Sequence, residues 1–94
     1  MYFITSVSKN ADEYRCVGYF SDKDTAIEVV ENNVGDLYEA GLYPYVIIEN
    51  IPEGIYQYDQ DPTWFTYVEK TDKYQICSTP LEIRKQHLVG FGIG

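Results

Sequence analysis

The sequence predicts a single α+β domain over residues 1–94, built mainly from an antiparallel sheet of about five or six strands. Three observations predict this fold class. Several short segments rich in β-branched and aromatic residues are separated by turn residues, which is typical of antiparallel strands. The segment from Ser21 to Gly41 repeats apolar residues at helical spacing, and Pro80 to Gln86 begins with helix-start residues. A length of 94 residues suits one domain with one core.

The central strand is predicted from the run that follows Tyr43. Residues Tyr45 to Ile48 are apolar at consecutive positions, so neither face of this strand meets water and something covers each side of the sheet there. Pro52 and Gly54 then turn the chain, and Ile55 to Tyr58 begins another extended segment.

A hairpin of two strands is expected before the helix, over Tyr2 to Val7 and Tyr14 to Phe20. Gly18, inside the second strand, indicates a bulge or a close approach by another backbone. Ser21 is expected to cap the helix, with Asp24 as its acidic partner three positions later.

The predicted helix is amphipathic, and one apolar stripe should lie on the sheet. Glu28, Glu31 and Asn32 fall on the other side. Gly35 should break or kink the helix, and Gly41 should end it. The apolar positions are Ala26, Ile27, Val30, Val34, Leu37 and Tyr38.

A second hairpin is predicted after the central strand, over Thr63 to Glu69 and Tyr74 to Ser78. Thr79 directly before Pro80 then predicts a short C-terminal helix as far as Gln86. The tail that follows is apolar and free of charged side chains, so we expect it to dock on the body of the domain.

The chain is strongly acidic. Fifteen acidic and seven basic residues give a formal charge of −8, which repels nucleic acid backbones and anionic membranes, so direct binding to either is not expected. The start has no basic leader, and no stretch approaches 18 consecutive apolar residues. A cytoplasmic location is therefore expected.

Few residues are available for catalysis. A nucleophile would have to be Cys16, Cys77, or a serine or threonine activated by a base, and the only histidine is His87. The two cysteines and His87 are not spaced as metal ligands. Both cysteines lie in predicted strands, where a buried thiol is ordinary. Two pairs of carboxylates could serve in acid-base catalysis or hold a divalent ion. Asp59 and Asp61 lie at the turn before Pro62, and Asp22 and Asp24 lie in the first turn of the helix, and acidic residues are locally favoured at both places. We expect no enzyme activity, no cofactor and no tightly bound metal.

An aromatic set in the second half of the chain is the best candidate binding surface. Strand alternation puts Trp64 on one face and Phe65 and Tyr67 on the other, so one group can fill the core and the other can meet a partner or a planar ring. Cationic side chains would meet phosphates if they converge. In the alternative interpretation, the rings only cover a thin sheet and the cations are solvated. The candidate ligand-binding residues are Arg15, Tyr56, Tyr58, Trp64, Tyr67, Arg84 and Lys85.

Five features of the sequence also carry a resemblance. They are the opening Met1-Tyr2-Phe3-Ile4-Thr5, the arginine and Gly18-Tyr19-Phe20 of the second strand, the run from Val46 to Ile51 closing on Gly54-Ile55, the pair Trp64-Phe65, and the tail Gly90-Phe91-Gly92-Ile93-Gly94. Over nearly its whole length the chain resembles a family of small proteins from gut Firmicutes and their phages. Small acidic single-domain proteins of phages are often inhibitors of bacterial defence, and the resemblance implies this context in a bacterial host cell.

Two binding functions of different classes follow. In the first, the protein sequesters a nucleotide immune signal, with tyrosine or tryptophan rings stacking a base and Arg15, Arg84 or Lys85 taking the phosphates at an interface between two copies of the chain. In the second, the protein is an acidic inhibitor that blocks a basic site on a bacterial defence protein. A structural or interaction module is the third alternative.

Overall fold

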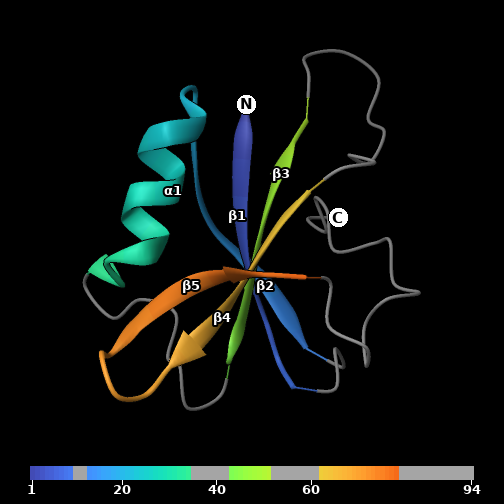
Figure 1. Cartoon of the computed structure of the whole chain (residues 1–94). Coiled ribbons are helices and arrows are strands. Elements are labelled where there is room, and N and C mark those ends of the chain that lie inside the picture. The colour runs from blue at the N-terminus through green and yellow to red at the C-terminus, as the bar shows by residue number, and fades with distance from the viewer. Residues whose placement is uncertain (10–12, 35–42, 52–61, 79–94) are drawn as a thin grey trace.

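The computed structural model of the chain describes residues 1–9, 13–34, 43–51 and 62–78. Within these ranges the chain forms five strands and one helix (Figure 1). In chain order the elements are β1 (Tyr2–Val7), β2 (Tyr14–Phe20), α1 (Lys23–Glu31), β3 (Tyr45–Asn50), β4 (Thr63–Val68) and β5 (Lys73–Cys77).

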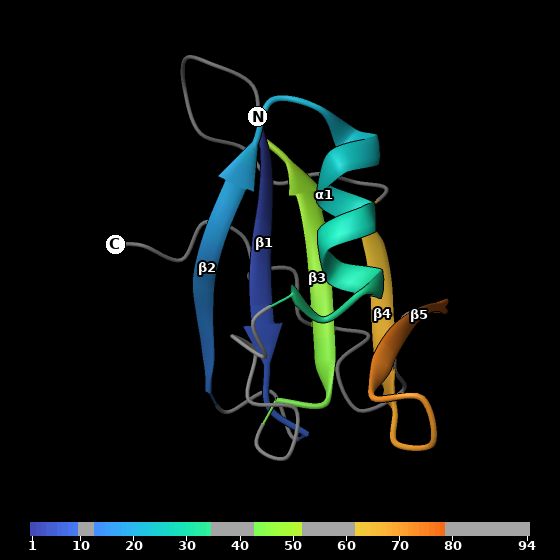
Figure 2. The same cartoon turned by 90° about the vertical axis from the view of Figure 1, so that its left-hand side faces the viewer.

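The five strands form one antiparallel sheet in the order β2-β1-β3-β4-β5. Figure 2 looks onto the face that α1 covers, which we call the helix face, and the opposite side is the second face. The α+β class, the two hairpins and the central place of the Tyr45 strand are confirmed. The strand predicted over Ile55 to Tyr58, the helix predicted over Pro80 to Gln86 and the tail lie outside the described residues.

The core has two parts because β3 is buried on both faces, as its apolar run predicts. Val46 belongs to a cluster on the helix face, whereas Ile47 packs with Val7 and Trp64 on the second face. Alternation along the strands assigns the side chains to these two clusters. The buried cluster on the helix face consists of Ile4, Ala26, Val30, Val46, Ile48, Phe65 and Tyr74.

The edge strand β2 contains a bulge at Val17. Ile4 pairs with Gly18, but the next residue, Thr5, pairs with Cys16, so one residue of β2 has no counterpart on β1. A bulge beside Gly18 is therefore present as predicted, although the extra residue is Val17 and Gly18 itself pairs with Ile4. A close backbone approach is not present, because no heavy atom lies within 4 Å of the position that a Cβ would take at Gly18.

The helix starts one residue later than the sequence predicts, because Asp22 and not Ser21 is the N-cap. Asp22 has extended backbone angles, and its carboxylate accepts hydrogen bonds from the backbone N–H and from Oγ1 of Thr25, at 2.9 and 2.7 Å. An ionised carboxylate is a stronger acceptor than a hydroxyl, and it also favours the positive end of the helix dipole.

The helix also ends earlier than the break predicted at Gly35. The backbone N–H and the side-chain amide of Asn32 both donate to the carbonyl of Glu28, at 3.1 and 2.9 Å. Asn33 then has a φ of 47°, in the left-handed region where asparagine often ends a helix. Val34, which the helical stripe would have buried, is therefore 49% exposed.

Candidate binding surface

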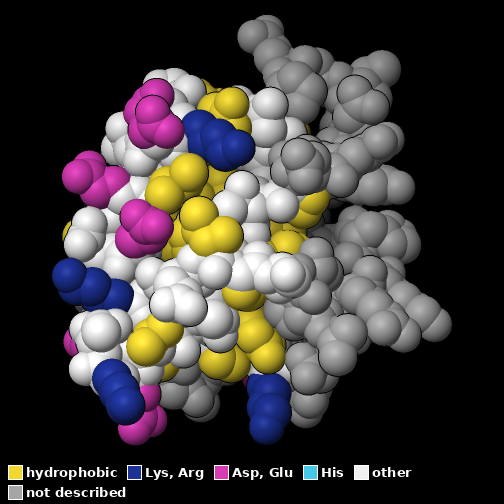
Figure 3. Space-filling view, viewed as in Figure 1, with side chains coloured by type: hydrophobic (Ala, Val, Ile, Leu, Met, Phe, Trp, Pro, Cys, Tyr) yellow, Lys and Arg dark blue, Asp and Glu magenta, His cyan; other side chains and the backbone are white. Residues whose placement is uncertain are grey.

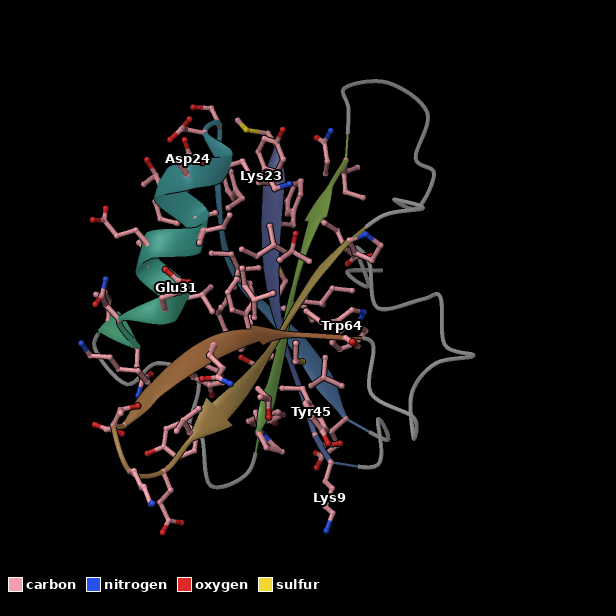
Figure 4. All side chains as sticks on the ribbon, viewed as in Figure 1. Lys9, Lys23, Asp24, Glu31, Tyr45 and Trp64 are labelled. Carbon is pink, nitrogen blue, oxygen red and sulfur yellow. The ribbon has the colours of Figure 1, made fainter. Side chains whose placement is uncertain are left out.

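The outer side of α1 carries three carboxylates in one row. Asp24, Glu28 and Glu31 are exposed and follow the spacing i, i+4, i+7, which places them on one side of a helix. The buried residues Ala26 and Val30 fix the rotation of α1 against the sheet, so this row faces away from it. Acidic side chains gather over α1 in Figure 3, and Figure 4 labels Asp24 and Glu31 toward its two ends. We call these three residues the acidic row.

The local electrostatics of α1 favour its acidic residues only at the N-terminal end. Hydrogen bonds from the side chain and the backbone of Thr25 hold the pKa of the Asp22 carboxyl below its ordinary value. Glu28 and Glu31 instead lie toward the negative end of the helix dipole, and the last turn contains no basic residue. Among the described residues, no cation forms an ion pair with the acidic row.

A hydrogen-bonded group holds the C-terminal end of α1 on the turn between β4 and β5. The side-chain amide of Asn33 donates to the backbone carbonyl of Asp72 at 3.3 Å and lies 3.5 Å from its carboxylate. That carboxylate also accepts a 2.5 Å hydrogen bond from the hydroxyl of Tyr67. The Tyr67 ring meets Tyr74 edge-on, with 5.4 Å between centroids. These contacts fix where the acidic row stands relative to β5.

Trp64, the predicted stacking residue, lies in the core of the second face. It is 4% exposed and packs with Val7 and Ile47, with Tyr45 and Cys77 at the edge of the cluster. In this structure its ring is covered, so stacking a ligand on it would first require the cluster to open.

The structure separates the other predicted ligand-binding residues that it describes. Tyr67 lies on the helix face of β4, opposite to Trp64, because the two side chains alternate. Arg15 pairs with Ser6 on the edge strand β2, and the strands β1 and β3 lie between it and β4. At about 4.8 Å per strand, β2 and β4 are roughly 14 Å apart. Tyr56, Tyr58, Arg84 and Lys85 lie outside the described residues.

An aromatic pair on the second face, half-buried Phe3 and exposed Tyr19, was not predicted from the sequence. Phe3 of β1 and Tyr19 of β2 pair across the strands, and their ring centroids are 5.4 Å apart. Tyr19 is 59% exposed. The signal that could have found this pair is the register of the first hairpin, because the bulge at Val17 decides which residue of β2 faces Phe3.

The two free cysteines differ in environment. Cys16 is exposed on β2, and Cys77 is partly covered at the end of β5, where burial raises the pKa of its thiol. Within the described ranges, no group of three His, Cys, Asp or Glu side chains is arranged to hold a metal ion. The helix that the structure describes is too short and too polar to cross a bilayer.

Comparison of the chain with protein-family models, with curated proteins and with solved structures finds no match.

Proposed function

We propose that this protein is a non-enzymatic binding protein that places the acidic row of α1 on a basic site of another protein. In the context that the family resemblance implies, the partner is a bacterial defence protein whose basic site is blocked. The proposal ranks this function above nucleotide sequestration. The described part of the chain offers an exposed row of carboxylates, whereas Trp64 is covered and Arg15 is separated from β4 by the two strands β1 and β3.

The observation that carries the proposal is that Glu28 and Glu31 oppose the local stability of their own helix. A carboxylate near the C-terminal end of a helix costs about 0.3 to 1 kcal/mol at low salt, and like charges three or four residues apart cost about 0.2 to 0.5 kcal/mol per pair. Lysine at either position would remove both penalties. Residues that depart from a local rule are most often retained for function, and solubility alone needs no acidic residue at these two places.

Charge reversal with a matched control tests the proposal. The variant Glu28→Lys/Glu31→Lys and the control Glu13→Lys/Glu69→Lys each change four charge units, from −8 to −4, at exposed positions. Tagged wild type and both variants are used to capture proteins from a bacterial host extract, with the bound proteins quantified by mass spectrometry. We expect a basic partner that wild type and control retain, and that the α1 variant binds at least tenfold more weakly, because attraction becomes repulsion at two contacts.

The salt dependence of the captured complex gives a second readout. Contacts between exposed charges are screened beyond about 10 Å at 0.1 M salt and beyond about 3 Å at 1 M, so a complex formed through the acidic row should weaken steeply over this range. Equal capture by the α1 variant and the control would contradict the proposal.

The aromatic pair of Phe3 and Tyr19 favours a second candidate function, sequestration of a nucleotide signal. A ring that is 59% exposed on an edge strand offers a face on which a base can stack, typically for about 1 to 3 kcal/mol. A thermal-shift screen against cyclic dinucleotides and cyclic ADP-ribose isomers tests this function. Stabilisation that is lost in Tyr19→Ala supports it, and a flat response to every compound removes it.

A further inference from the structure

Among the described strands, β5 is an edge of the sheet, and its pairing is regular. It is the last strand in the order β2-β1-β3-β4-β5, and no described residue pairs with its outer side. Its pairing with β4 runs from Val68–Lys73 to Trp64–Cys77 without a register shift. The other edge, β2, is interrupted by the bulge at Val17, which is a common protection against pairing with another strand. Of the two edges, β5 is therefore the better template for an additional strand.

The hydrogen-bond pattern shows which backbone groups β5 presents. The N–H of Tyr67 donates to the carbonyl of Pro44 at 2.9 Å, so Tyr67 and its alternate neighbour Phe65 turn their backbone groups toward β3. The alternate residues Trp64, Thr66 and Val68 turn toward β5 and pair there with Cys77, Gln75 and Lys73. The N–H and C=O of Ile76 consequently point away from the sheet, as free backbone groups of an edge strand do.

The side chain of Ile76 lies on the helix face of the sheet and not on the second face. Ile76 pairs with Phe65, whose ring is fully buried in the cluster on the helix face, and opposite residues of two strands share a face. Ile76 itself is 56% exposed. The hydrogen bonds from Asn33 to Asp72 hold the end of α1 at the start of β5. Figure 3 shows hydrophobic side chains next to acidic ones on this side of the molecule.

We propose that β5 accepts an extended, lysine- or arginine-containing segment of the partner protein as a sixth strand. This inference rests on the proposed function and specifies the form of the partner. The backbone of the segment bonds to the N–H and C=O of Ile76, and one of its apolar side chains covers the Ile76 side chain. Its basic side chains lie on the same face and extend toward the carboxylate of Glu31 at the C-terminal end of α1, which forms no ion pair with a described cation.

Charge decides the occupant in favour of a basic partner over a second copy of this chain. Antiparallel pairing of two β5 edges about a twofold axis leaves the helix faces of both copies on the same side of the joined sheet. Two acidic rows and two chains of charge −8 would then repel each other. A basic segment gains attraction from the same charges.

Amide exchange of the full chain, followed by NMR, tests the inference with a defined probe. The probe is a ten-residue peptide in which lysine and valine alternate, and its control is the same peptide with glutamate in place of lysine. We expect the lysine peptide to slow exchange of the Ile76 amide at least tenfold and to shift its resonance, whereas the glutamate peptide leaves both unchanged. No change at Ile76 at millimolar lysine peptide overturns the inference. Protection of Ile76 that grows with protein concentration in the absence of peptide also overturns it, because it shows self-pairing.

Two substitutions of Ile76 test whether the peptide binds to the backbone of this residue. In Ile76→Pro the outward N–H is removed, and the fold tolerates it because this N–H does not bond to β4. Ile76→Lys keeps the backbone and sets a positive charge against the lysine peptide, with Ser21→Lys beside the opposite edge as the matched control for an exposed side chain. Thermal unfolding checks the fold of each variant. We expect both Ile76 variants to bind the peptide at least tenfold more weakly than Ser21→Lys, and equal binding overturns the inference even if the proline variant fails to fold.

The same variants distinguish failure of this inference from failure of the proposed function. If Glu28→Lys/Glu31→Lys loses the host partner and Ile76→Lys retains it, the acidic row binds the partner and the sixth strand is wrong. If Ile76→Lys loses the partner and the α1 variant retains it, strand addition stands and the role of the acidic row is wrong.

Discussion

Replacing Glu31 by lysine is expected to stabilise the fold although it removes part of the candidate binding surface. Glu31 is the last residue of α1, is exposed and lies three residues after Glu28, in a turn without a basic residue. The substitution removes one unfavourable charge at the negative end of the helix dipole and adds a favourable one. It also turns a repulsive pair with Glu28 into an attractive pair.

The expected increase in the free energy of unfolding is the sum of the helix-dipole contribution and the contribution of the pair with Glu28. Reversing a terminal charge changes the dipole interaction by about 0.6 to 2 kcal/mol at low salt, and reversing the pair with Glu28 adds about 0.4 to 1 kcal/mol. Solvent screening at an exposed site reduces the sum, so we expect about 1 kcal/mol. For a domain of 94 residues this corresponds to a rise in Tm of roughly 4 to 8 °C.

Urea and thermal unfolding at 20 mM and at 500 mM salt measure the effect. Glu13→Lys is the control, because Glu13 is exposed, lies outside the helix and gives the same change in net charge, from −8 to −6. The control isolates general relief of self-repulsion from the local terms of α1. The reasoning fails if Glu31→Lys is no more stable than Glu13→Lys at low salt, or if its advantage is undiminished at high salt.

Three further predictions concern the fold and its titrating groups. Phe65→Ala should cost about 3 to 5 kcal/mol in urea unfolding because its ring is fully buried under α1, and a loss below 1 kcal/mol would contradict this packing. Hydrogen bonds from Thr25 lower the pKa of Asp22, so the cap stabilises α1 at neutral pH, and this stabilisation is lost as the pH falls below the ordinary aspartate pKa of about 3.9 toward the lowered pKa of the folded state. The substitution Asp22→Asn should therefore reduce the fall of Tm with decreasing pH. An unchanged pH dependence of Tm in this variant would show that Asp22 is not the N-cap. At pH 8, iodoacetamide should modify Cys16 before Cys77, whose pKa is raised by burial, and mass analysis would reveal the opposite order.

Local rules were sufficient to predict the strands. The run from Tyr45 to Ile48 is apolar at every position, and only a strand covered on both faces hides such a run, so its central place in the sheet could be predicted. The helix ends were harder to place. Ser21 and Asp22 are both good N-caps, and the choice depends on which side chain reaches the N–H of Thr25. At the other end, Asn33 stops the helix before Gly35.

The candidate binding surface was only partly predictable. Helical spacing places Glu28 and Glu31 on the outer side of α1, as the sequence indicates. Alternation assigns Trp64 to a face of β4, but the periodicity of one strand does not reveal that this ring is covered. The contact of Phe3 with Tyr19 depends on a one-residue bulge, and periodicity alone does not locate such a shift.

Two departures from locally favourable choices lie on the same side of the molecule. On α1, carboxylates occupy the turn where lysine or arginine would stabilise the helix. On β5, an edge strand ends in Gln75-Ile76-Cys77 and presents a half-exposed isoleucine where a charged residue would prevent pairing with other strands. Basic residues in the last turn of α1 would stabilise the helix, and a charged residue in place of Ile76 would protect the edge strand from unwanted pairing. A surface that receives a basic, extended segment needs both departures, because the open backbone of β5 supplies affinity and the acidic row selects for positive charge.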